Sequence, residues 1–144
     1  MAINTTPTFP IRGDTSSDNG TTYQGALTTA AADYNGTSAN NALVHTAGPS
    51  GSLIRGVKFK AIGTNVASAA RIYKNNGSTP TVAANNQFQD EATLPATTAT
   101  NVATTPPIYV PLNIKLKPGE RLYVGLATTV AAGWVPIVDA EQYE

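Results

Sequence analysis

The chain has 144 residues, of which 41% are hydrophobic and only 12% are charged, and its nine basic side chains balance its nine acidic ones. This length and hydrophobic content predict one domain with a core of its own. The balanced charge argues against a nucleic acid or an acidic membrane surface as a partner. The absence of cysteine excludes a disulfide scaffold, a thiolate metal site and a cysteine nucleophile.

The N-terminal segment, residues 1–22, is polar and contains few apolar side chains. It holds too little apolar surface to offset the entropy lost on ordering it. We expect a flexible arm in which Phe9 and Ile11 act as anchors on a neighbouring chain, followed by one domain over residues 23–144. No signal peptide is expected, and no apolar run approaches the roughly 20 residues of a membrane helix, so we expect a protein that is soluble in a cytoplasm.

Short predicted strands follow, separated by glycine, proline and asparagine. Residues 23–32 fit a helix or a strand, and Thr28 and Thr29 favour the strand. After a turn at residues 33–36, strands are predicted at 41–46, 52–62, 69–74, 88–94, 108–116, 121–126 and 133–139, with 99–102 as a candidate edge strand. Pro136 indicates an edge strand or a bulge. About eight short strands predict an all-β sandwich or barrel.

The clearest alternation lies in residues 108–126. A two-residue hairpin at Lys117–Glu120 would pair Leu116 with Arg121 and place a charge on the apolar face. Either a three-residue loop pairs Leu116 with Leu122, or the chain crosses to a second sheet. We favour the crossing, and with it an antiparallel sandwich of jelly-roll type. The expected core is Val57, Phe59, Ile72, Ile108, Val110, Leu112, Ile114, Leu116, Leu122, Val124 and Leu126.

Few side chains suggest a reaction. The single histidine, His45, lies on a predicted strand, where a structural role is the usual one. A calcium site at Asp14 and Asp18, or at Asp90 and Glu91, is an alternative to ordinary solvated acids. No phosphate-binding glycine loop or nucleophile elbow is present. We predict no catalytic, cofactor-binding or metal-binding residue, and no enzyme activity.

Aromatic side chains suggest an interface instead. Tyr73, Tyr109 and Tyr123 fall on the outward phase of their predicted strands, and Trp134 is a fourth candidate. Tyrosine and tryptophan favour surfaces that are partly apolar and partly wet, as in protein interfaces or on sugar rings. With the low surface charge, this pattern predicts self-association, for which we favour a homotrimer.

From Gly51 onward the chain resembles the capsid decoration, or cement, proteins of tailed bacteriophages. The motifs that carry the resemblance are Ser52–Arg55, Ala70–Gly77, Leu112–Ile114, Lys117–Leu126 and Ala131–Trp134. The resemblance implies a jelly-roll-like β-sandwich that binds the major capsid protein on the outside of the head and stabilises it, often as a trimer. It also implies that the protein is part of the virion and is made in a bacterial host.

A carbohydrate- or receptor-binding module of a phage fibre or tail is the alternative. Sugar binding would require Trp134 and a tyrosine to lie coplanar and exposed near polar loops. Capsid binding would instead bury the tyrosines against neighbouring chains. The exposure of these aromatic side chains therefore separates the two hypotheses.

Overall fold

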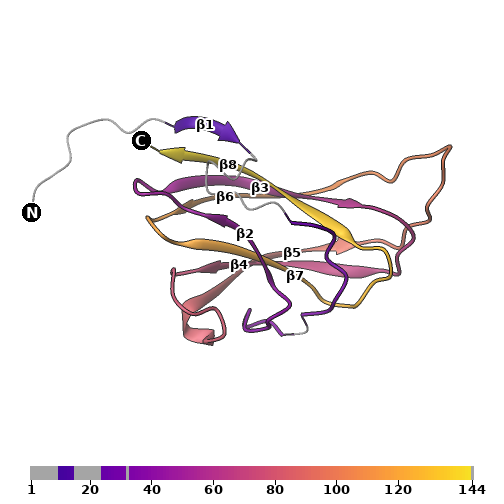
Figure 1. Ribbon diagram of the computed structural model, residues 1–144, viewed down its shortest axis with the longest axis horizontal. Helices are drawn as coiled ribbons and strands as arrows, with labels where there is room; N and C mark the ends of the chain where they lie inside the picture. The colour runs from indigo at the N-terminus through magenta and orange to yellow at the C-terminus, as the bar shows by residue number, and fades with distance from the viewer. Residues whose placement is uncertain (1–9, 15–23, 32, 144) are drawn as a thin grey trace, which may run out of the picture.

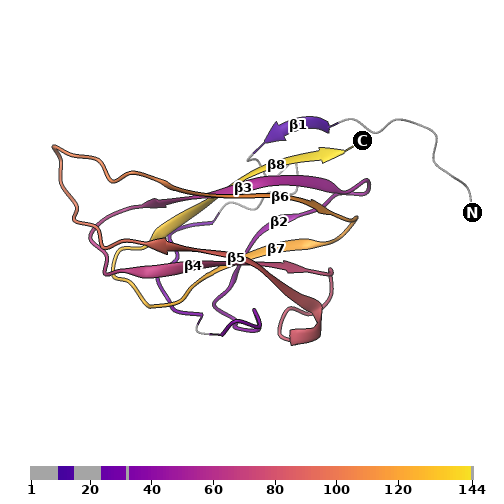
Figure 2. The same cartoon turned by 180° about the vertical axis from the view of Figure 1, so that it is seen from behind.

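Two antiparallel four-stranded sheets pack face to face (Figures 1 and 2). The computed structural model describes residues 10–14, 24–31 and 33–143. The first sheet has the order β1-β8-β3-β6, with β1 (Pro10–Asp14), β8 (Trp134–Tyr143), β3 (Ser52–Ala61) and β6 (Ile108–Leu116). The second has the order β2-β7-β4-β5, with β2 (Ala42–Thr46), β7 (Arg121–Leu126), β4 (Ser68–Asn75) and β5 (Asn86–Leu94). A short 3-10 helix, η2 (Ala83–Asn85), precedes β5.

The predicted all-β sandwich is confirmed. Seven of the predicted strands correspond to β2 through β8, with ends that differ by a few residues. The predicted crossing at Lys117–Glu120 is also confirmed, because β6 belongs to the first sheet and β7 to the second. Pro136 interrupts no pairing with β1, since β1 covers β8 only from Ala140 onward. Among the described residues, no strand pairs with Pro136 on the side of β8 that faces away from β3, as the proline indicated.

The strand pairing follows one regular scheme. Strand β1 pairs with β8, β2 with β7, β3 with β6 and β4 with β5, and every pair is antiparallel. The pairs β3–β8 and β4–β7 join them into the two sheets. The chain therefore behaves as one long antiparallel ribbon whose four strand pairs alternate between the two layers. Most of its contacts join residues far apart in sequence.

The core lies between the sheets and matches the alternation of the sequence. Eight of the eleven predicted core residues are buried, whereas Ile108, Leu112 and Ile114 are partly buried and pack against the core margin. These three lie on β6, the outermost strand of the first sheet. An edge strand is covered from one side only, which explains their partial exposure.

Residues 23–32 do not form the predicted strand. From Gln24 to Ala31 the backbone is irregular and makes only isolated bridges, from Leu27 to Trp134 and from Ala30 to Leu126. Tyr23 and Ala32 lie outside the described residues. The predicted edge strand at 99–102 is wrong as well, since this part of the chain has no ladder partner. Threonine favours an extended backbone there, but within the described residues no strand lies beside this segment to pair with it.

Strand β1 falls inside the segment that was predicted to be an arm. Residues 10–14 pair with β8 from Ala140 to Tyr143, so they belong to the sandwich. Phe9 and the remainder of residues 1–22 lie outside the described residues, as does the side chain of Ile11. An edge strand needs only backbone hydrogen bonds on one side, which leaves little alternation for sequence reading to detect.

An outer layer covers the second sheet. Arg71 and Tyr73 point away from the core, as predicted, yet both are buried. The Tyr73 hydroxyl donates to the carbonyl of Asp33 at 2.8 Å, and the Arg71 guanidinium lies 3.9 Å from the ring centre of Tyr34. Residues 24–41, which we name the covering segment, therefore bury side chains that a two-layer sandwich would expose. The prediction that Tyr73 is exposed is wrong for this reason.

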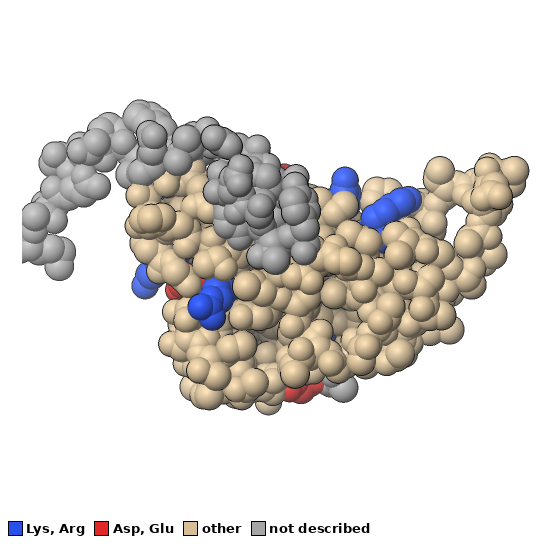
Figure 3. All heavy atoms as spheres, in the orientation of Figure 1, with Lys and Arg blue, Asp and Glu red and all other residues tan. Residues whose placement is uncertain are grey.

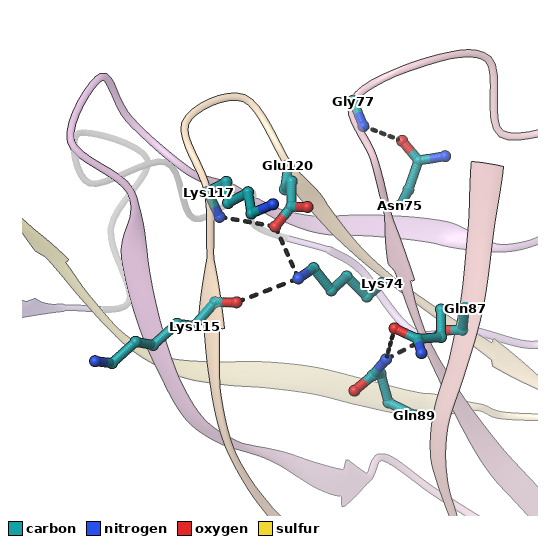
Figure 4. Close-up of polar contacts among 8 residues, drawn as sticks. All are labelled: Lys74, Asn75, Gly77, Gln87, Gln89, Lys115, Lys117 and Glu120. Carbon is teal, nitrogen blue, oxygen red and sulfur yellow. Dashed lines mark hydrogen bonds and ion pairs between the residues drawn. The ribbon is translucent and has the colours of Figure 1, made fainter. Parts of the chain in front are cut away.

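A polar connection joins the two sheets at one end of the sandwich (Figure 4). The Glu120 carboxylate accepts hydrogen bonds from the backbone of Lys117 at 2.7 Å and from Lys74 at 2.9 Å. The Lys74 ammonium also donates to the carbonyl of Lys115 at 3.3 Å. Burial alone would raise the pKa of Glu120, but these hydrogen bonds outweigh burial and lower it. Lys74 on β4 thus holds the turn that follows β6.

A charge in the centre of the core should unfold the domain. Val124 is fully buried, and a lone buried charge costs several kcal/mol against a total stability of about 5–15 kcal/mol. We expect Val124→Asp to be unfolded by circular dichroism, and Leu112→Asp, at the partly exposed margin, to be folded with a lower melting temperature. A soluble Val124→Asp variant that melts cooperatively would contradict the core assignment.

The covering segment should be sensitive to one added methyl group. Gly36 has φ +71°, and a Cβ there would stand 2.8 Å from the Tyr73 ring. Gly119 has a similar φ of +79° with open space around it, so it serves as a control. In both alanine variants, backbone strain should lower the free energy of unfolding by about 1–3 kcal/mol. We expect Gly36→Ala to lose more than Gly119→Ala in urea unfolding, and equal losses would refute the packing described.

Candidate functional site

One half-exposed tyrosine, Tyr109, lies on the outer face of the first sheet, near the start of its edge strand β6. Tyr109 stands opposite Lys58 of β3, which in turn stands opposite Ile137 of β8. Directly opposed residues share one face of a sheet, so these side chains form a row across three strands. Tyr109 is 48% exposed, which agrees with its predicted outward position.

The Tyr109 ring lies against the backbone of β3 at Gly56. A Cβ atom at Gly56 would stand 2.5 Å from the Tyr109 hydroxyl oxygen and 2.6 Å from its Cζ atom. Any other residue would push the ring away. Gly56 stands opposite Asp139 of β8, which brings the Asp139 carboxylate near the Tyr109 hydroxyl. Burial, and after it the charge of Asp139, raises the pKa of Tyr109, so the hydroxyl is protonated at neutral pH.

A shallow pocket of about 230 Å³ accompanies this ring and is lined by Lys58, Tyr109, Ile137, Val138 and Asp139. It combines an aromatic ring and aliphatic side chains with one cation and one carboxylate. Such a mixture suits non-covalent contact with a partner that is half apolar and half polar. We name this surface, together with Gly56 beneath the ring, the Tyr109 face.

Basic side chains outnumber acidic ones around the Tyr109 face. Arg55, Lys58 and Lys60 lie on β3 and Lys115 on β6, whereas β8 contributes two acids, of which Glu141 pairs with Arg55. Within the described residues, Lys58 and Lys115 form no ion pair, and both are exposed. Beside the ring itself, the charges of Lys58 and Asp139 balance each other, and the excess of basic side chains lies farther along β3 and β6. Over the side of the molecule drawn in Figure 3, charged side chains are sparse and the visible surface is mostly uncharged.

Trp134 does not belong to any surface. Its side chain is fully buried in the core cluster, and its backbone exchanges two hydrogen bonds with Leu27 of the covering segment, at 2.8 and 3.1 Å. The interpretation of Trp134 as an interface residue is therefore wrong. Tyr123 is half-buried, opposite Tyr73 on the covered outer face of the second sheet. Tyr109 is thus the predicted aromatic that the structure leaves most accessible.

Sequence reading missed the residues that position Tyr109. A glycine in the interior of a strand often marks a close approach by another group, so Gly56 carried a usable signal. Lys58 and Asp139 carried none, because their place beside Tyr109 depends on the register of three strands. That register includes an irregularity in β3 between Ile54 and Gly56, which no local pattern predicts.

His45 is a core residue. Its ring is fully buried, and its Nε2 atom lies 2.8 Å from the Ser52 hydroxyl, the donor being set by the tautomer. Burial lowers the pKa of His45 to about 4, so the ring is neutral at pH 7. This environment agrees with the structural role expected from the sequence.

No cluster of three or more potential metal ligands occurs among the residues that the structure describes. Asp90 and Glu91 are both exposed, and Glu91 lies 3.5 Å from the buried Arg71 guanidinium. Asp18 lies outside the described residues, and so does the side chain of Asp14. In the described part of the chain, no helix has the length and apolar character needed to span a membrane.

No protein-family model matches this chain, and neither a curated protein nor a solved structure is significantly similar to it. The function must therefore be argued from the surface chemistry of the chain and from its sequence motifs.

Acid should destabilise the protein through His45. The unfolded chain has a histidine pKa near 6.5 and the folded protein one of about 4, so the unfolded state takes up the proton first as the pH falls. The stabilisation by neutral His45 is complete above pH 6.5 and is lost between about 6.5 and 4. At pH 5.5 the free energy of unfolding should be about 1 kcal/mol lower than at pH 7.

Urea unfolding at pH 7 and pH 5.5 measures this loss before most carboxylates titrate. The variant His45→Gln should show a smaller difference between the two pH values than the original protein. If both proteins lost the same free energy of unfolding, another group would be responsible for the pH dependence.

Proposed function

We propose that this protein is a non-enzymatic structural component of a tailed-bacteriophage particle, which binds the outer surface of the head and stabilises it. The proposal rests on the sequence motifs that resemble capsid decoration proteins and on the Tyr109 face. Its partner is the major capsid protein, and its place is on the capsid surface of the virion. Copies associate as a homotrimer in this proposal.

We further propose that the sandwich is of jelly-roll type. The pairing of β1 with β8, β2 with β7, β3 with β6 and β4 with β5 supports this assignment. A jelly roll arises when a long antiparallel ribbon of eight strands folds over into two sheets. The crossing between β6 and β7 is one of the places where the ribbon passes from one sheet to the other.

The Tyr109 face is the observation that carries the docking proposal. Tyrosine supplies a large rigid surface at low entropic cost, and it is enriched among the residues that dominate binding energy in interfaces. Here the ring is already fixed by Gly56 and Asp139, so little ordering remains to be done on binding. The Lys58 ammonium, which forms no ion pair within the described residues, favours a carboxylate on the partner next to the apolar area that covers Tyr109.

The carbohydrate-binding alternative loses its expected platform. It required Trp134 to be exposed beside a tyrosine, and the indole is buried in the core. Of the described tyrosines in the first sheet, Tyr109 is exposed and Tyr143 is partly exposed at the C-terminal end of β8, and neither packs against a second ring. On the second sheet, Tyr34 and Phe88 are exposed but meet edge to face and not in one plane. These described side chains form no coplanar aromatic pair on which a sugar ring could stack.

Electron microscopy of heads incubated with the purified full-length protein tests the proposed function. Heads assembled without this protein should acquire regularly spaced density on their outer surface, in clusters of three copies. They should also resist heating better than bare heads. Heads that bind no protein under these conditions would overturn the proposal.

Replacing the Tyr109 ring should weaken this binding. We expect Tyr109→Ala to reduce retention on heads at least tenfold, because an aromatic side chain that anchors an interface can contribute about 2 kcal/mol or more to binding. Phe88→Ala is the control, since Phe88 is a partly exposed aromatic on the opposite sheet. Both variants must melt as folded proteins. Equal retention of the two variants would show that the Tyr109 face is not the docking surface.

A further inference from the structure

A long loop projects from one end of the sandwich. Residues 95–107 connect β5 to β6, and we name them the projecting loop. Figures 1 and 2 show the orange segment extending well beyond the ends of the strands. It carries no charged residue from Pro95 to Pro107. Loops of this length without secondary structure are uncommon in compact domains and are usually functional.

The base of the projecting loop is fixed to the body of the domain. Thr97 is buried and exchanges two backbone hydrogen bonds with Asn65, at 3.0 and 2.9 Å. The Asn65 side chain donates to the Thr97 hydroxyl at 3.1 Å and to the carbonyl of Gly133 at 3.2 Å. On the returning side, the Lys60 ammonium donates to the carbonyl of Thr105. Both ends of the loop are therefore held in place.

The tip of the projecting loop is exposed and uncharged, with threonine and asparagine side chains beside its alanines and Val102. Every residue from Thr98 to Thr104 is exposed, and Val102 has 93% of its surface in contact with solvent. Single exposed apolar residues are common on protein surfaces. The position of Val102 is unusual because it tops a projection whose base is already ordered. Burying this tip in a partner would cost little additional chain entropy.

The projecting loop is continuous with the Tyr109 face. Pro107 leads directly into β6, where Tyr109 is the second residue, and Lys60 lies two positions beyond Lys58 on β3. Because Lys60 holds the loop to β3, one partner that covers Tyr109 would lie within reach of the loop. The loop extends this surface past the end of the sandwich, as its outline shows in Figure 3.

We propose that the projecting loop inserts Val102 into an uncharged, apolar pocket of the same capsid protein that covers Tyr109. This inference rests on the proposed function, because it assigns a second contact to the same docking partner. The absence of charge in the loop sets the chemistry of the pocket, since an uncharged tip offers no compensation for a buried carboxylate or ammonium group. The neighbouring side chains are small, Asn101 before Val102 and Ala103 after it, so the tip can enter a narrow opening while the Asn101 amide stays hydrogen-bonded at its rim.

Retention on heads assembled without this protein tests the inference with a matched pair of variants. Val102→Asp places a charge at the loop tip, and Val82→Asp places one at another exposed valine, next to η2. Both side chains are exposed, so both variants should melt within about one degree of the original protein. We expect Val102→Asp to bind heads at least tenfold more weakly and Val82→Asp to bind as the original does.

Each failure of this experiment has a separate meaning. If Val102→Asp binds heads as well as Val82→Asp while Tyr109→Ala binds poorly, the role of the loop is wrong and the docking face stands. If Val102→Asp changes only the sedimentation of the free protein, the loop contacts a second copy of the chain, and our assignment of the partner is overturned. If the original protein does not bind heads, both the proposed function and this inference fail.

Discussion

The backbone bridge between Leu27 and Trp134 is the contact on which the arrangement of layers depends. Trp134 begins β8 in the first sheet, and its two hydrogen bonds with Leu27 fix the covering segment at that sheet. A few residues on, the Ala31 amide donates to the carbonyl of Leu126 in the second sheet at 2.6 Å. The covering segment therefore spans both layers. The burial of Tyr73, which lies against Asp33 and Gly36 of this segment, follows from this attachment.

This attachment makes the two outer faces of the sandwich different. On the second sheet, the outward Tyr73 is covered by the chain itself, whereas Phe88 stays partly exposed and packs edge-on against the exposed ring of Tyr34. The first sheet keeps Tyr109 and Lys58 accessible. A side chain that is already covered buries little additional apolar area when a partner binds. A fixed, half-exposed ring buries more and so contributes more to the free energy of binding. The docking surface and the projecting loop both lie on the side that the covering segment leaves open.

Alternation alone was sufficient to predict most of the fold. Apolar residues at every second position located β3, β4, β6 and β7, and the conflict between Leu116 and Arg121 revealed the crossing between sheets. The sequence could not reveal the covering segment, because it pairs through isolated bridges and buries side chains whose strand phase points outward. For the same reason, the alternation of side chains along β4 correctly predicted that Tyr73 points outward but could not predict that it is buried. Of the Tyr109 face, only Tyr109 itself was predicted from the sequence. The residues around it are brought together by the pairing register of three strands, which the sequence does not reveal.

The pairing of β1 with β8 has a consequence for how the protein reaches this structure. The earliest and latest strands of the described chain lie side by side, and each other ladder of the ribbon closes a loop inside that one. Contacts of such large sequence separation give a high contact order, which is associated with slow folding on the scale of milliseconds to seconds. During synthesis, β1 emerges from the ribosome long before its partner exists. The first sheet can therefore be completed only after β8 has been made, and an unpaired edge is present until then.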